Sequence, residues 1–321
     1  MTILKPSRRD ILRLAAIAPA FAMPAAVRAQ LGAPSGDNPA HFRFTLGDTR
    51  LTILSDGYFS LPTTGTGINA DPAEVQALLT RHFLSSEMGY SHTNHLLIEK
   101  DEDVILVDVG SGSRFFDTVG RLTANMQAAG IDPASITHVV ITHAHPDHIW
   151  GIRDDFDEPI FPDAQYFLGQ IERDYWLQDD LVNKVEPTEQ QFVLGAVNSI
   201  NAEGVDWNLL ADGDEVVPGV RVIHTPGHTP GHLSVVIEDG DKQLIALGDC
   251  MTHAYLNFQR PTWYNGTDHD GDQTVQTRLR LLDMCAADRI AVLGYHFPFP
   301  GVGHVLRDGD AYSFVPALWQ F

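Results

Sequence analysis

The densest group of chemically useful side chains lies in residues 142–148, where three histidines and an aspartate follow an apolar run. His143 and His145 are two positions apart, so on an extended chain both side chains point to the same side. Pro146 then forces a turn, which can bring the aspartate and the third histidine to the same point. Imidazole and carboxylate ligands at this spacing are typical of a metal site and favour Zn²⁺ over Fe or Mn.

Three more candidate ligands follow apolar segments later in the chain. His228 lies in the string GHTPGH, whose glycines allow the backbone a tight turn close to an ion. Asp249 follows the apolar run 244–247, where a carboxylate is costly unless it is paired or bound to metal. His296 follows a third apolar run, 290–293. We expect these side chains to complete a metal-binding set, with the two oxygens of Asp249 able to bridge two ions.

Composition argues against several other classes of function. The chain has 42 Asp and Glu residues against 21 Lys and Arg, a formal net charge of −21. Because a nucleic acid or an anionic membrane surface is bound by a basic face, this acidic balance argues against both as partners. Two cysteines are too few for a disulfide scaffold or a cysteine-rich zinc module. We expect both, Cys250 and Cys285, to be buried small side chains and not nucleophiles.

Short segments of aliphatic and β-branched residues, bounded by turn residues, must position these ligands. They predict strands over residues 42–46, 50–55, 94–99, 104–109, 138–142, 165–168, 220–224, 233–238 and 243–247. Helical patterns cover residues 72–82, 114–129, 169–177, 188–200 and 272–287. Strands and helices do not alternate strictly, so we expect two sheets packed face to face with helices outside, in one domain.

The first 40 residues predict an export signal and a linker. Residues 1–29 begin with basic residues, continue with an apolar and small-residue run and end on small residues. Residues 7–12, SRRDIL, resemble a twin-arginine signal, which predicts the twin-arginine export machinery as a transient partner and a periplasmic or secreted product without a stable membrane anchor. Residues 30–40 read as a linker, which leaves 41–321 as the folded domain.

The ordered motifs HxHxDH, GHTPGH, LGD and a late histidine followed by an aromatic residue and proline resemble the metallo-β-lactamase superfamily. The flanking strings 46–48, 54–57 and 296–304 are most similar to exported organophosphate hydrolases of the methyl parathion hydrolase type and related lactonases. The resemblance implies an α/β fold, an αββα sandwich of two mixed sheets flanked by helices. The resemblance implies that His143, His145 and His228 bind one ion. It implies that Asp147, His148 and His296 bind the other, and that Asp249 bridges the two.

The same resemblance implies a hydrolase with two Zn²⁺ per chain, with Fe, Mn and Co as alternatives. Two ions about 3.5–4 Å apart lower the pKa of a water between them toward 7, which makes a hydroxide nucleophile. Asp147 and Asp249 are the expected catalytic carboxylates. The implied substrate is a small neutral ester, either an organophosphate triester or a lactone, and a homodimer is suggested by the resemblance alone.

Aromatic and histidine side chains are expected to line the substrate pocket, by position in the resemblance and by closeness to Asp249. These are Phe115, Trp176, Phe192, His253 and Tyr255. Other chemistries remain open within the superfamily: thioester hydrolysis of the glyoxalase II kind, an iron persulfide dioxygenase, or a β-lactamase. A binding protein that keeps the fold without catalysis is a further alternative.

Overall fold

The computed structural model describes residues 38–318. The predicted export signal at residues 1–29 and the linker up to residue 37 lie outside the described residues. Within residues 38–318, no helix combines the length and the apolar character that crossing a bilayer requires.

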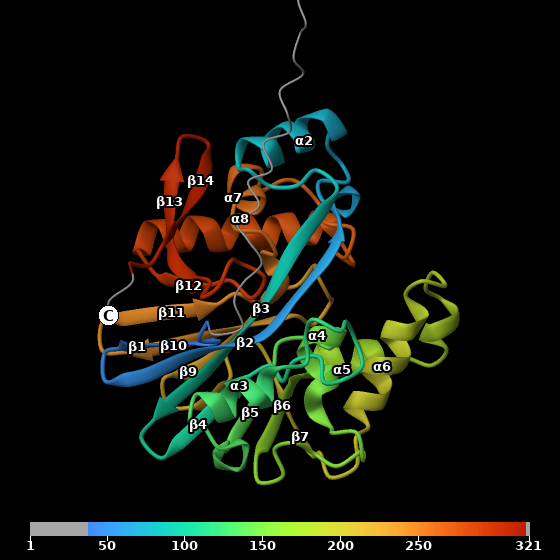
Figure 1. The fold of residues 1–321 in the computed structure, drawn as a ribbon, viewed down its shortest axis with the longest axis vertical. Helices are drawn as coiled ribbons and strands as arrows, with labels where there is room; N and C mark the ends of the chain where they lie inside the picture. The colour runs from blue at the N-terminus through green and yellow to red at the C-terminus, as the bar shows by residue number, and fades with distance from the viewer. Residues whose placement is uncertain (1–37, 319–321) are drawn as a thin grey trace, which may run out of the picture. The chain divides into compact units, whose positions relative to one another are not determined.

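Two seven-stranded mixed sheets form the centre of this part of the chain (Figure 1). The first runs in the order β1 (His41–Leu46), β2 (Thr49–Pro62), β3 (Met88–Lys100), β4 (Asp103–Val107), β5 (His138–Ile141), β6 (Gln165–Gly169) and β7 (Trp207–Leu210). The second runs in the order β14 (Ala311–Pro316), β13 (Val302–Asp308), β12 (Ala291–Leu293), β11 (Lys242–Ala246), β10 (Leu233–Asp239), β9 (Val220–His224) and β8 (Glu215–Val217).

The helices lie outside this pair of sheets. They are α2 (Pro72–Arg81), α3 (Leu122–Ala128), α4 (Pro146–Ile149), α5 (Gln170–Trp176), α6 (Gln190–Ile200), α7 (Leu256–Gln259) and α8 (Gly271–Asp288). Figure 1 shows α8 beside the second sheet and α3, α5 and α6 beside the first. The fold is therefore the predicted αββα sandwich.

Alternation along single strands explains the layers. On β4, Ile105 and Val107 belong to the core between the two sheets, whereas Leu106 packs with the helices of the first sheet. On β10, Val235 joins the core between the sheets and Val236 joins the core under α8. Because successive side chains on a strand point to opposite faces, an apolar strand of this kind is buried on both sides.

The helix predicted over residues 114–129 is wrong in its first half, because α3 begins only at Leu122. Gly120 has a φ of +78°, and a Cβ there would lie 2.1 Å from the carbonyl oxygen of Gly112. The buried carboxylate of Asp56 accepts hydrogen bonds from the backbone N–H groups of Gly120 and Leu122. The left-handed residue Gly120 and the hydrogen bonds to Asp56 hold the backbone before Leu122 out of helical geometry, so the helix begins after them.

Several strands are longer than predicted or were not predicted. β2 continues past residue 55 to Pro62, and a bulge between Ser55 and Gly57 interrupts its pairing with β3. A bulge bends a strand without ending it, so the turn residues there misled the prediction. Strands β7, β8, β13 and β14 were missed, because their sequences are short or largely polar and several of their residues are exposed.

The candidate ligands come from loops at one shared edge of the two sheets. The loops follow β5, β11 and β12, and one joins β9 to β10. Two backbone hydrogen bonds join the sheets at this edge, from Leu233 N to Thr142 O at 2.9 Å and from Asn94 N to Tyr295 O at 3.0 Å. Loops far apart in the sequence are thus held within side-chain reach of one another.

Candidate metal centre

The loop after β5 has the shape that its sequence predicts. His145 is extended, with φ −73° and ψ 160°, and Pro146 starts the one-turn helix α4. Proline is favoured at the first position of a helix because it has no N–H to leave unsatisfied. His143 and His145 therefore leave an extended segment, while Asp147 and His148 lie on the following turn.

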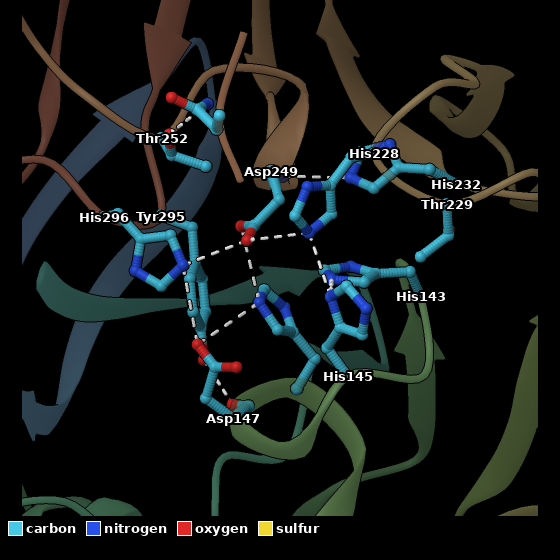
Figure 2. Close-up of polar contacts among 12 residues, drawn as sticks. His143, His145, Asp147, His228, Thr229, His232, Asp249, Thr252, Tyr295 and His296 are labelled. Carbon is cyan, nitrogen blue, oxygen red and sulfur yellow. Dashed lines mark hydrogen bonds and ion pairs between the residues drawn. The ribbon is translucent and has the colours of Figure 1, made fainter. Parts of the chain in front are cut away.

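All seven predicted ligands meet in one buried cluster (Figure 2). On one side, His145 Nδ1 lies 3.1 Å from His143 Nε2 and 2.9 Å from His228 Nε2. On the other side, Asp147 Oδ2 lies 3.5 Å from both His148 Nε2 and the Nε2 of His296. The ligand atoms within each of these two groups lie within 4.8 Å of one another.

Asp249 lies between the two groups. Its Oδ2 atom is 3.3 Å from His228 Nε2 and 3.0 Å from His296 Nε2. Its Oδ1 atom is 3.4 Å from His148 Nε2. One carboxylate therefore reaches nitrogen atoms of both groups, as the bridging role expected from the sequence requires.

The donor set fits metal cations. Asp147 Oδ2, His148 Nε2 and Asp249 Oδ1 are buried atoms without a hydrogen-bond partner. Unpaired buried polar atoms of this kind are costly, and three in one cluster call for a common partner. Imidazole nitrogens and carboxylate oxygens are ligands that zinc accepts.

Hydrogen bonds on the far side of the rings support the same conclusion. His148 Nδ1 lies 2.8 Å from Asp108 Oδ2. His228 Nδ1 lies 3.1 Å from Asp268 Oδ1, and His296 Nδ1 lies 2.8 Å from the carbonyl oxygen of His92. An Nδ1–H that donates to such an oxygen leaves the Nε2 lone pair facing the cluster. Lone pairs of nitrogen and carboxylate oxygen that face each other repel unless a proton or a metal ion lies between them.

The electrostatics divide the histidines into two kinds. Burial and then the neighbouring imidazoles lower the pKa of His143 and His145 well below the usual value, so these rings are neutral. Burial also opposes protonation of His148, yet the carboxylates of Asp147, Asp249 and Asp108 raise its pKa well above the usual value. Burial disfavours the charge on Asp249, but His296 and His148 hold its pKa well below the usual range. The carboxylate side of the cluster thus attracts positive charge.

Glu172 is a structural side chain of the site that the sequence did not reveal. It is fully buried on α5, and Ala144 N and Trp176 Nε1 donate to its Oε1 atom at 2.9 and 2.7 Å. Thr229 Oγ1 and Gly231 N donate to Oε2 at 2.6 and 3.1 Å. This one carboxylate joins the loop of His143 to the loop of His228. A glutamate in a polar helical stretch gives no sequence signal for such a role.

His232 positions Asp249 through the backbone. Its Nε2 accepts a hydrogen bond from Asp249 N at 2.9 Å, and its Nδ1 lies 2.7 Å from Thr225 Oγ1. Burial lowers the pKa of His232 to about 3, so the ring stays neutral and can accept this bond. The second histidine of GHTPGH therefore supports the cluster from outside it.

Three of the five predicted pocket side chains lie near the cluster. The ring of Trp176 lies 5.7 Å and that of Phe192 6.5 Å from the ring of His145, between centroids. Phe115 does not contact the cluster directly. Its ring lies 5.4 Å from that of Phe59, and the ring of Phe59 lies 5.5 Å from that of His296, between centroids. Aromatic walls thus adjoin both sides of the cluster.

The other two predicted pocket residues contact a different group. The ring of Tyr255 stacks on His82 with 4.5 Å between centroids. His253 Nδ1 accepts hydrogen bonds from the backbone N–H groups of Tyr255 and Leu256, at 3.1 and 3.3 Å, at the start of α7. These contacts are structural and give no direct link from either side chain to the cluster.

Both cysteines are buried and free of disulfides. Cys250 Sγ donates to the carbonyl oxygen of Leu247 at 3.0 Å, and burial raises the pKa of its thiol to about 12. Burial likewise raises the pKa of Cys285 to about 12. Because the thiolate is the nucleophile, neither side chain suits nucleophilic catalysis at neutral pH.

With this geometry in place, the family of the chain is clear. The sequence profile of the metallo-beta-lactamase superfamily matches residues 88–284, more than half of the chain. The chain belongs to this superfamily.

Similar proteins are hydrolases and lactonases. An N-acyl homoserine lactonase of a Bacillus species is 25% identical over 194 residues, which cover 54% of this chain and 69% of that protein. A crystal structure of the hydrolase AbOPH in the beta-lactamase superfamily is 27% identical, with a TM-score of 0.81 over 88% of this chain and 99% of the other. AidC, a dizinc quorum-quenching lactonase, has the same fold, with 24% identity and a TM-score of 0.78 over the same shares.

Proposed function

We propose that this protein is a dinuclear zinc hydrolase of neutral lactones and esters. The observation that carries the proposal is the position of Asp249, within 3.0–3.4 Å of nitrogen atoms from both groups of ligands. Two zinc ions, when bound, supply a water that is deprotonated near neutral pH and a Lewis acid for the carbonyl or phosphoryl oxygen. His143, His145 and His228 would hold one ion, Asp147, His148 and His296 the other, and Asp249 both.

The chain's own residues would do the remaining work. Asp147 would hold the attacking water beside the ions and take up the proton that the water loses. The oxygen of the attacking water would add to the carbonyl carbon to give a tetrahedral adduct. When this adduct collapses, the ester C–O bond breaks and the proton held by Asp147 would pass to the departing oxygen. Asp249 holds the two groups of ligands together throughout.

The walls of the cluster favour a neutral substrate with an apolar part. The indole N–H of Trp176 donates a hydrogen bond to Glu172, so the part of the ring beside His145 is apolar. The buried ring of Phe59 packs beside His296, and the half-buried ring of Phe192 lies beside His145. Apolar walls with few polar groups are typical of small-molecule pockets. The lactonase relatives support a lactone as the first candidate substrate.

Neutral phosphotriesters are the second candidate, because the motif strings around the ligands resemble organophosphate hydrolases. The same ions and carboxylates would serve both substrates, since each reaction adds water to a polarised C=O or P=O group. A phosphotriester carries no net charge, so the acidic chain would not repel it as it would a polyanion.

The test is a screen of the purified protein against N-acyl lactones, aryl esters and phosphotriesters, with metal content and oxygen uptake measured alongside. We expect two zinc ions per chain and turnover of lactones without oxygen uptake. His143→Ala should remove metal and activity together. His304→Ala is the matched control, because that histidine is exposed on β13, outside the cluster. Iron with oxygen uptake would support a dioxygenase instead, and full turnover by His143→Ala would contradict the mechanism.

We also propose that the protein acts after export through the twin-arginine route. The support is the pattern of residues 1–29. Fusing this segment to a reporter that is active only after export tests the proposal, with a variant in which Arg8 and Arg9 are both replaced by Lys as the control. A reporter that stays inside the cell would contradict it.

A further inference from the structure

Arg278 is a fully buried cation away from the cluster. It lies on α8 with no exposed surface. Its Nε donates to the carbonyl oxygen of Cys250 at 3.2 Å, and its Nη1 donates to those of Pro261 and Trp263 at 2.9 and 2.7 Å. Removing a guanidinium from water costs several kcal/mol, so a buried arginine needs a compensating partner or a function.

The partner charge is the carboxylate of Asp268. Arg278 Nη2 lies 3.9 Å from Asp268 Oδ2, and the two side chains are 0% and 1% exposed. Asn265 N donates to the same oxygen at 3.0 Å. In a dry interior, opposite charges at this distance attract far more strongly than at the surface. Arg278 therefore holds Asp268 in position and balances its charge.

The second oxygen of Asp268 reaches the metal cluster. Oδ1 lies 3.1 Å from His228 Nδ1, whose ring is 2% exposed. The opposite ring atom, Nε2, lies 2.9 Å from His145 Nδ1 and 3.3 Å from Asp249 Oδ2. A carboxylate that accepts from Nδ1–H keeps the proton on that nitrogen and leaves Nε2 free to bind an ion.

Backbone bonds hold this chain of side chains rigid. His269 N donates to His228 O at 3.1 Å, and Asp270 N donates to Gly227 O at 2.9 Å, so the segment of Asp268 runs alongside the loop of His228. A Cβ on Gly227 would lie 2.2 Å from Thr274 N on α8, so no side chain fits between that loop and the helix of Arg278. The backbone on both sides of the contact between Asp268 and His228 is thus held in place.

We propose that Asp268 and Arg278 are positioning residues that fix the proton and the direction of the His228 ring. This inference rests on the proposed metal centre. The ion held by His143, His145 and His228 would depend on Asp268. The ligands of the other ion are supported by different hydrogen bonds, from His148 to Asp108 and from His296 to the carbonyl oxygen of His92. Loss of Asp268 therefore weakens one of the two metal sites selectively.

The experiment is a titration of the metal-free protein with Zn²⁺ against a chromophoric chelator, repeated with Co²⁺ to record its visible ligand-field spectrum. For Asp268→Ala we expect one of the two sites to lose affinity about 10- to 100-fold and its part of the Co²⁺ spectrum to change. Asp268→Asn keeps an oxygen that can accept from Nδ1–H, so it should restore part of the affinity. Asp272→Asn is the control, because that carboxylate lies on α8, the helix of Arg278, and accepts a hydrogen bond from Tyr264 instead of contacting the cluster.

The outcomes separate this inference from the proposed function. If the wild-type chain binds two ions and Asp268→Ala binds both with unchanged affinity and spectrum, the positioning role is wrong and the metal centre stands. If both sites of Asp268→Ala weaken equally, the role is wrong because the effect is a general loss of structure. A wild-type chain that binds no metal overturns the proposed function and this inference together. Arg278→Lys, which keeps a charge but not the fork of donors, should weaken the same single site as Asp268→Ala if the relay is correct.

Discussion

At the scale of residues, the site depends on carboxylates that have different surroundings. Asp249 contacts imidazoles from both groups, whereas Glu172 contacts only hydrogen-bond donors. The first is therefore suited to bind cations and the second to hold loops together. The two roles predict different losses when each charge is removed.

Asp249→Ala should lose both ions, because its oxygens reach nitrogen atoms of both groups. We expect metal content near zero after dialysis and activity reduced by at least about 10³-fold, as is typical when a metal catalyst is lost. Elemental analysis of the dialysed protein and a lactonase assay check this. Retention of one ion with native affinity would show that the carboxylate does not bridge.

Glu172→Gln should destabilise the fold without removing a ligand. Each oxygen of Glu172 accepts from two donors, so an amide NH₂ in place of one oxygen would face two N–H or O–H groups. We expect the free energy of unfolding to fall by about 3 kcal/mol, the size of lost charged hydrogen bonds. Denaturant unfolding measures it, with the exposed Glu186→Gln as the matched control. Equal stability of the two variants would contradict the role of Glu172.

At the scale of elements, two glycines with left-handed backbone flank α3. Gly120 and Gly130 have nearly the same φ, +78° and +75°, but only Gly120 is crowded, with Gly112 O at 2.1 Å from a would-be Cβ. Alanine at Gly130 would therefore measure the free-energy cost of the left-handed φ alone, whereas alanine at Gly120 would add the cost of the clash with Gly112 O.

Gly130→Ala should cost about 1 kcal/mol, the penalty of the left-handed conformation alone. Gly120→Ala should cost clearly more, because the backbone must move and the hydrogen bond from Gly120 N to Asp56 moves with it. Unfolding curves of the two variants provide the comparison. Equal losses would mean that the turn before α3 adapts freely.

The start of α7 predicts a pH effect. Burial and then the charge of His82 lower the pKa of His253 to about 4 in the folded protein. Its ordinary value is about 6.5. Above about pH 6.5 neither state is protonated, and below it the unfolded chain takes up a proton that the folded chain refuses. Stability is therefore full above that pH and falls as the pH drops toward 4.

From about pH 7.5 to about pH 5 this group should lower the free energy of unfolding by roughly 1 to 2 kcal/mol. His253→Asn cannot titrate and keeps an acceptor for the N–H groups at the start of α7. The difference in unfolding free energy between wild type and this variant should thus shrink toward acid. A difference that is independent of pH would rule out His253 as the titrating group.

At this scale the sequence predicted the ligand-bearing loops better than the elements around them. Residues 142–148 and the string GHTPGH carry their geometry in local spacing and proline turns, and both folded as expected. The first turns of the expected helix 114–129 were decided by Asp56, a contact over more than 60 residues. The same applies to Glu172, Asp268 and Arg278, whose roles depend on donors and charges that only the tertiary fold brings near.

At the scale of the whole molecule, the candidate metal centre joins the two sheets. His143, His145 and His148 follow β5 of the first sheet, whereas His228, Asp249 and His296 follow or connect strands of the second. Ions that bind both sets cross-link the halves of the sandwich. Ligands that bind only the folded state stabilise it by mass action.

Removal of metal should therefore lower the thermal midpoint of unfolding. At free zinc about 1,000 times the dissociation constant, each ion contributes about 4 kcal/mol. Calorimetry with and without a chelator measures the change, and the chelator should leave Asp249→Ala unaffected. If the chelator leaves the thermal midpoint of the wild-type protein unchanged, metal does not hold the two sheets together.

The most direct test of the account is a crystal structure of the zinc-loaded protein with anomalous scattering recorded at the zinc edge. We predict two peaks, one among His143, His145 and His228 and one among Asp147, His148 and His296, with Asp249 in contact with both. A single peak, or zinc bound only elsewhere on the molecule, would contradict the dinuclear centre.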